Sequence, residues 1–267
     1  MHRRPAVAGS FYPAHTETLE REVRACLGEV RGSRRAVAVL SPHAGYIYSG
    51  SCAGRTYAEI AVPGLAVVLC PNHTGLGEPL ALMTEGEWET PLGTVPVDGA
   101  LAMRLKDLDP EISIDAGAHT REHALEVQLP FLQVLRPGIR IVPLCVGTRR
   151  LSSLLGLGDA IAGAIRASGE DVLIVISSDM SHYIPFEKAR LRDAIAIDRM
   201  ENLDAEGLHE AVESEDISMC GYCPAVAGIR AARSLGATRG TLVCYTSSGD
   251  RTGDYDEVVA YAGMVFN

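Results

Sequence analysis

Apolar residues along the chain gather in six short runs that predict buried strands. Within each run Val, Ile, Leu and Ala follow one another almost without interruption, instead of alternating with polar residues. Such runs are typical of strands that are buried on both faces of a sheet. The runs are Ala36–Leu40, Leu65–Cys70, Arg140–Val146, Asp171–Ser177, Thr241–Thr246 and Val258–Val265.

Segments with helical spacing of apolar residues lie before and between these runs. They are Thr16–Val30, Ser49–Ile60, Glu122–Leu135, Leu151–Ala167, Phe186–Met200 and Ala225–Ser234. Repeated strand–helix order predicts βαβ units, and so an α/β fold with a mostly parallel, doubly wound sheet and helices on both faces. The segment Leu80–Pro96, with Trp88 and two prolines, predicts a hairpin or an irregular insertion. Because no long Gly/Ser/Pro linker divides the chain, we expect a single domain over residues 1–267.

Composition and charge narrow the classes of function. The 267 residues are 47% apolar, enough for a sizeable core, and the net charge is −10. This acidic balance argues against a nucleic-acid binder and against an anionic membrane surface as partner. No window approaches the roughly 18 uninterrupted apolar residues of a membrane span, and the basic N-terminus lacks the apolar segment of a signal peptide. The odd number of cysteines, seven, suggests free thiols in a reducing compartment. We therefore expect a cytoplasmic protein.

Three histidines follow the ends of predicted strands. His43 comes after Ala36–Leu40, His73 after Leu65–Cys70, and His182 after Asp171–Ser177. Ligand sites of open parallel sheets lie beyond the carboxyl ends of the strands. If the three strands are parallel neighbours, these imidazoles converge on one crevice. The alternative is that each is an isolated polar loop residue.

Convergent imidazoles bind metal ions or transfer protons. Two histidines and one anionic side chain form the facial set that holds non-haem iron, and a third histidine beside the ion can act as general base. Asp179, three residues before His182, is placed either to orient an imidazole or to cap a turn or helix.

The candidate anionic ligand is Cys220 in the sequence Met219–Pro224, where it forms a C-x-x-C pair with Cys223. The pair precedes the predicted helix Ala225–Ser234, and a helix N-terminus favours a thiolate. A redox dithiol, or two thiols without a special role, are the alternatives.

A second pattern competes for the metal. Residues His119 to His123 fit H-x-x-E-H, the inverted zinc-peptidase pattern with Glu122 as base. Both histidines of this pattern lie on one face only if the segment is helical, whereas the residues before His119 predict a loop. In other interpretations Glu122 sits at a helix N-terminus, or Glu122 and His123 line the crevice of the strand-end histidines. Tyr46, shortly after His43, is a further crevice candidate.

Taken together these motifs make the chain similar to the Memo family, which is structurally related to the class III extradiol (LigB-type) dioxygenases. The resemblance covers the chain almost end to end and implies a LigB-like α/β fold. It is carried by Arg4–Pro13, Ser41–Tyr46, Asn72-His73, Glu122-His123 with Glu126 and Leu129-Pro130, Ser177–His182, and Cys220-Gly221 with Pro224.

The resemblance implies site residues and a cofactor. Positions matching His43, His73 and Cys220 are metal ligands in the family, with iron or copper, and the position matching His182 is similar to the catalytic base of the dioxygenases, with Asp179 beside it. A cysteine in place of the dioxygenase carboxylate is a departure, which shifts the ligand preference towards Cu(I) or zinc.

The resulting expectation is a metal-dependent oxidoreductase, an oxidase or dioxygenase-like enzyme that acts on a small molecule or peptide. The alternative is a non-catalytic module that binds a peptide or partner protein in the same crevice, and a zinc peptidase comes third. The resemblance also implies radical-SAM and AMMECR-type proteins as members of the same pathway. Animal relatives bind phosphotyrosine peptides, but this chain has no obvious basic pocket motif.

Overall fold

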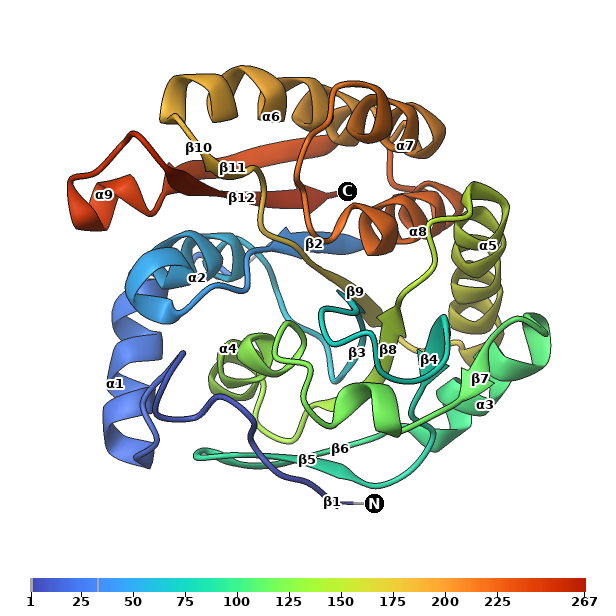
Figure 1. Cartoon of the computed structure of the whole chain (residues 1–267). Helices are drawn as coiled ribbons and strands as arrows, with labels where there is room; N and C mark the ends of the chain where they lie inside the picture. The colour runs from blue at the N-terminus through green and yellow to red at the C-terminus, as the bar shows by residue number, and fades with distance from the viewer. Residues whose placement is uncertain (1, 33) are drawn as a thin grey trace.

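The computed structural model describes residues 2–32 and 34–267, and one large sheet organises them (Figure 1). Within these residues the sheet has nine strands in the order β10-β12-β2-β9-β3-β8-β4-β7, with β11 paired to β12. The strands are β2 (Ala38–Ser41), β3 (Leu65–Pro71), β4 (Leu80–Leu82), β7 (Ser113–Ile114), β8 (Arg140–Val146), β9 (Val172–Ser177), β10 (His182–Ile184), β11 (Gly240–Ser247) and β12 (Val258–Phe266). A small second sheet joins β1 (His2–Arg3), β5 (Glu87–Thr90) and β6 (Gly93–Pro96), so the expected hairpin is β5–β6.

The predicted α/β class is confirmed. The four central strands β2, β9, β3 and β8 are parallel, whereas β12 and β4 run antiparallel to them on either side. β12 also runs antiparallel to β11, and that direction has a local cause. Between β11 and β12 the chain forms only a short turn of helix, α9 (Gly249–Thr252), which is too short to return to the start of a parallel strand.

Helices cover both faces of the sheet (Figure 1). One face carries α1 (Thr16–Leu27), α2 (Ser51–Ala58) and α4 (Leu129–Leu135), and the other α3 (Gly99–Leu108), α5 (Leu151–Ser168), α6 (Phe186–Glu201), α7 (Ala205–Ser214) and α8 (Tyr222–Ser234). Across the described residues, no helix combines the length and apolarity that a bilayer crossing requires.

One helix starts later than its sequence pattern predicts. The expected helix Glu122–Leu135 is helical only over α4, after a 3₁₀ turn at Glu126–Gln128. Pro130 lies in the first turn of α4, where its missing N–H costs nothing. In a helix that began at Glu122 the same proline would fall in the interior and break it. Residues 122–125 are therefore left in a loop.

The central strands are buried on both sides, as their composition predicts. In β9 the side chains of Ile174 and Ile176 enter the core under α5 and α8, and those of Leu173 and Val175 enter the core under α1 and α2. All four are fully buried. Polar residues follow where these strands end. Because the strands are parallel, their ionisable groups collect at the carboxyl-end edge of the sheet.

The close approach of α1 and α2 at Gly54 and the open surface at Gly156 of α5 predict opposite effects of Gly→Ala changes at the two positions. A Cβ atom at Gly54 of α2 would lie 2.2 Å from the backbone oxygen of Cys26, so Gly54→Ala should lower the free energy of unfolding by about 1–3 kcal/mol. Gly156 is exposed in α5 with nothing within 4 Å, so Gly156→Ala should raise it by about 0.5–1 kcal/mol. Urea unfolding at pH 7.5 measures both. Equal changes in the free energy of unfolding for the two variants would show that α1 and α2 are not in close contact at Gly54.

Candidate metal centre

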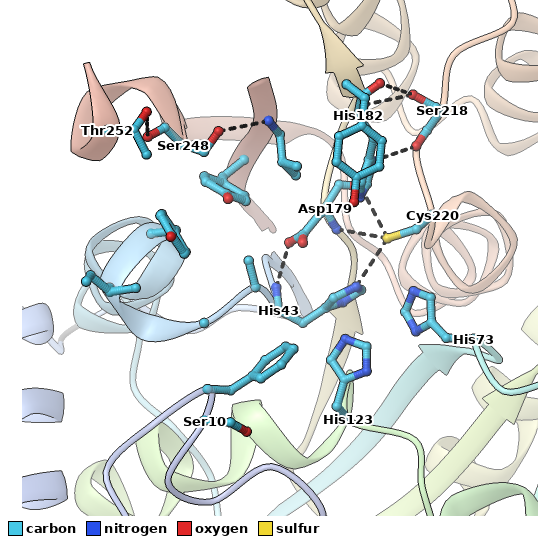
Figure 2. A pocket seen from close by; sticks show the side chains of 18 residues that line it. Ser10, His43, His73, His123, Asp179, His182, Ser218, Cys220, Ser248 and Thr252 are labelled. Carbon is cyan, nitrogen blue, oxygen red and sulfur yellow. Dashed lines mark hydrogen bonds between the residues drawn. The ribbon is translucent and has the colours of Figure 1, made fainter. Parts of the chain in front are cut away.

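The strand ends open into a cavity of about 770 Å³. His43 follows β2, His73 follows β3, and Asp179 and His182 follow β9, so the histidines predicted from three strand ends line one space. Two further groups come from other parts of the chain, as Figure 2 shows: His123 from the loop before α4, and Cys220 from the turn before α8.

Three imidazoles form a tight cluster within this cavity. The nitrogens that His43, His73 and His123 offer lie within 4.8 Å of one another. Cys220 Sγ lies 3.2 Å from His43 Nε2. A nitrogen and a sulfur bound to one ion at the usual lengths stand about 3.5 Å apart. His43 Nε2 and Cys220 Sγ are therefore spaced as two ligands of one ion would be, and the group in which all donor atoms are mutually close consists of the three imidazoles.

Ser177 fixes the tautomer of His43. Its hydroxyl donates to the carbonyl oxygen of Ala124 (2.6 Å) and accepts from Nε2 of Gln128 (2.8 Å). Because the only hydroxyl proton is used, the 2.9 Å contact between Ser177 Oγ and His43 Nδ1 requires Nδ1 to donate. Nε2 is then unprotonated, and it faces Cys220.

Glu122 does the same for His73. Its Oε1 atom lies 2.9 Å from His73 Nδ1, and its Oε2 atom accepts the backbone N–H of His73 at 2.7 Å. Burial alone would raise the pKa of Glu122, but its hydrogen bonds with His73 and Ala124 outweigh burial and hold the pKa below its usual value. A buried carboxylate behind a histidine is the common support of a metal-binding imidazole.

His182 is held by Ser218 and not by Asp179. Its Nδ1 donates to the Ser218 carbonyl oxygen (3.0 Å), and its backbone N–H donates to Ser218 Oγ (2.8 Å). Nε2 is thereby left free to take a proton. Asp179 instead accepts the backbone N–H of His43 (2.7 Å), and burial raises its pKa to about 6. The expectation that Asp179 orients the His182 ring is corrected accordingly.

The cluster is electrostatically prepared for a cation. Burial, together with His73 and His123, holds the pKa of His43 well below its usual value, and burial also lowers the pKa of His123. Neutral imidazole is the form that binds metal. Burial and then Asp179 raise the pKa of the Cys220 thiol, contrary to the thiolate expected at a helix start. A bound cation reverses that effect and deprotonates a coordinating thiol.

Tyr46 does not line the cavity, contrary to expectation. Its hydroxyl donates to the Val127 carbonyl oxygen (2.6 Å), and its ring packs against Phe131. The cause is a π-helical turn over Tyr46–Gly50, which directs Tyr46 into the core. Ile47 and Tyr48 line the cavity instead.

Phe11 is a cavity residue that the strand-end argument missed. It packs against His123 with 4.8 Å between ring centroids. The only signal for it in the sequence was its place in the segment Arg4–Pro13, which carries part of the family resemblance.

The H-x-x-E-H pattern does not form a two-histidine face. His119 is fully buried in a 3₁₀ turn, with Nε2 3.2 Å from the Ala81 carbonyl oxygen, and it is absent from the cavity wall. His123 lines the cavity, as one of the interpretations above expects, whereas Glu122 is buried behind His73 and is not part of the cavity wall. The first histidine of the pattern belongs to the core.

Comparison with other proteins places this chain among known sequences. A family model described as Memo-like protein matches residues 3–265. The chain belongs to the Memo family. A MEMO1 family protein of Aquifex aeolicus is 46% identical over 266 residues, covering 99% of this chain and 98% of the relative. Another from Methanothermobacter thermautotrophicus is 41% identical over 276 residues, covering 99% of this chain and 100% of the relative.

The fold also occurs outside such close relatives. An uncharacterised Escherichia coli K12 protein (JW3007) is similar in crystal structure with a TM-score of 0.55 at 16% identity, covering 85% of this chain and 99% of that one. At that identity the similarity speaks for the fold alone.

The burial of His119 predicts a loss of stability in mild acid. Burial lowers the pKa of His119 to about 4, from 6.5 for an exposed histidine. The stabilisation from the neutral ring is complete above pH 6.5 and is lost as the pH falls towards 4, by about 2 kcal/mol between pH 7.5 and 4.5. Urea titrations of metal-free protein at both pH values should show a smaller difference for His119→Gln. An equal loss in wild type and variant would contradict this assignment.

Proposed function

We propose that this protein binds one redox-capable metal ion, iron or copper, between His43, His73 and Cys220, with His123 completing the cluster. The observation that carries the proposal is the set of hydrogen bonds from Nδ1 of His43 and His73 to Ser177 and Glu122, which leave Nε2 of each ring as the atom that can bind an ion, with Cys220 Sγ 3.2 Å from that of His43. A thiolate beside imidazoles suits copper and zinc as well as iron.

We further propose that the centre serves an oxygen-dependent oxidation. The metal, when bound, supplies the electron-transfer chemistry that no side chain of the site has. His182 is the general base: Ser218 holds its protonated Nδ1, and Nε2 takes a proton from a bound ligand. Asp179 anchors the backbone of His43 and so keeps that imidazole at its place in the cluster.

The cavity wall favours an uncharged ligand that carries a ring. Aromatic side chains supply much of the wall: Phe11, Tyr48, Tyr183 and Tyr261. Among the described residues that line the cavity, none is lysine or arginine. A phosphorylated or carboxylated ligand would find no positively charged side chain there, and the protein carries a net charge of −10. Of the peptides that the alternative function could involve, a phosphotyrosine peptide has less support for the same reason.

Metal analysis tests the ligand set. Protein purified without a histidine tag should contain close to one equivalent of iron or copper, and His43→Ala or Cys220→Ser should lower the content at least about tenfold. His15→Ala removes an exposed histidine at the start of α1, outside the cavity, and is the matched control that should keep the metal. Elemental mass spectrometry measures all of them and identifies the metal. Unchanged content in the first two variants would reject these ligands.

Calorimetry with two small probes tests the ligand class. For metal-free protein we expect 4-methylphenol to bind at least about tenfold more tightly than phenyl phosphate, because the described wall residues offer aromatic contact and no lysine or arginine. Tyr183 is 73% exposed at the cavity rim, and Tyr183→Ala should weaken phenol binding about two- to tenfold. Leu191→Ala, an exposed change on α6, should not. Tighter binding of phenyl phosphate would instead favour the phosphopeptide function.

A further inference from the structure

Two cysteines outside the metal centre are in direct contact. Cys52 lies in the first turn of α2, and Cys244 lies in the middle of β11. Their Sγ atoms are 2.7 Å apart, and both residues are buried. The two are far apart in sequence, so the fold alone brings them together.

The neighbouring backbone is shaped to allow this contact. Gly263 of β12 pairs with Cys244, and a Cβ atom there would lie 2.9 Å from Cys244 Sγ and 1.9 Å from Thr56 Oγ1. Only glycine therefore leaves room for the sulfur between β11 and α2. A register shift between Leu242 and Cys244 also changes the course of β11 immediately before the cysteine.

The pair is also chemically unequal. Either thiol can donate across the 2.7 Å contact, and the contact lowers the pKa of Cys244, with Arg55 adding to the effect. Thiolate is the form of cysteine that attacks oxidants. In the described chain β11 pairs with β12 alone, and outer strands open locally more readily than central ones. Cys244 is thus the nucleophile, and Cys52 is the partner that resolves it.

We propose that Cys52 and Cys244 are an oxidative modification site, at which hydrogen peroxide produces an intramolecular disulfide. The Cys244 thiolate attacks one peroxide oxygen, the O–O bond breaks, and the released hydroxide takes up a proton to leave as water. The Cys52 sulfur then attacks the sulfenic acid, and the S–S bond forms as a second water leaves. Two thiols lose two electrons, and the peroxide gains them. The step needs no metal, so it is independent of the function proposed above.

The position of the pair gives the modification a structural effect. Cys52, Cys244 and Tyr261 form one small buried cluster, and Ala44 and Val259 pack against it. Tyr261, Ala44 and Val259 are also part of the cavity wall, and Ala44 directly follows His43. The disulfide joins α2 to β11 directly behind that wall.

Peptide mapping tests the proposal. Fully reduced native protein is treated with hydrogen peroxide, the remaining thiols are alkylated, and the protein is digested with trypsin without reduction. Residues 36–55 and 240–251 are released as peptides with one cysteine each. We expect these two peptides to be linked, with a mass two hydrogens below their sum, and the number of alkylated thiols to fall from seven by two. The thermal midpoint should rise, and dithiothreitol should reverse the rise.

Two variants complete the test. Cys244→Ser should abolish the linked species, and Cys52→Ala provides the same readout if the first variant does not fold by circular dichroism. Cys26→Ser removes a half-buried thiol of neighbouring α1 and should leave the 52–244 link intact. Alkylation of all seven thiols after peroxide treatment, or a link between other cysteines in the wild type, would overturn the proposal.

Discussion

The parallel register of the central strands is the constraint on which the site depends. Ser41 of β2 pairs with Ser177 of β9, and Leu69 of β3 pairs with Ile176 of β9. The three strands therefore end at nearly the same level of the sheet. The three strand ends thus lie side by side, and the residues that follow each strand can bring their side chains together without a long loop. A shift of one residue in one strand would turn its side chains to the other face and dismantle the cluster.

A second layer of buried polar groups holds the loop that contributes Glu122 and His123. The Glu126 carboxylate accepts the backbone N–H groups of Ala6 and Val7 and pairs with the Arg3 guanidinium, and the side chains of Arg3 and Glu126 are both buried. Arg3 also donates to the backbone oxygen of Glu122. Removal of either charge would leave the other buried without a partner, which is strongly destabilising. The N-terminal segment is thus joined to the loop of the metal centre.

The features that could be predicted from the sequence are those that depend on a local pattern of residues. The apolar runs located all four central strands. The histidines after three of them could be assigned to one site, because the position of a residue at a strand end follows once the strand itself has been predicted. The side of the chain that Tyr46 faces could not be predicted in this way, since a π-helical turn decides it. His123 was expected in the crevice but not as a member of the imidazole cluster, because its position depends on where Pro130 starts α4. The contact between Cys52 and Cys244 depends on the space left by Gly263, which no local pattern reveals.

The absence of lysine and arginine from the described cavity wall also affects the rate at which charged ligands reach it. A protein with a net charge of −10 surrounds itself with a negative potential, and the described residues of the cavity wall include no lysine or arginine that would weaken it. Such a field raises the encounter rate of a positive ion and lowers that of an anion, over distances limited by the roughly 8 Å screening length of physiological salt. Capture of a metal ion by the proposed centre would therefore be aided by the net charge of the protein, and phosphate and other small anions would be repelled.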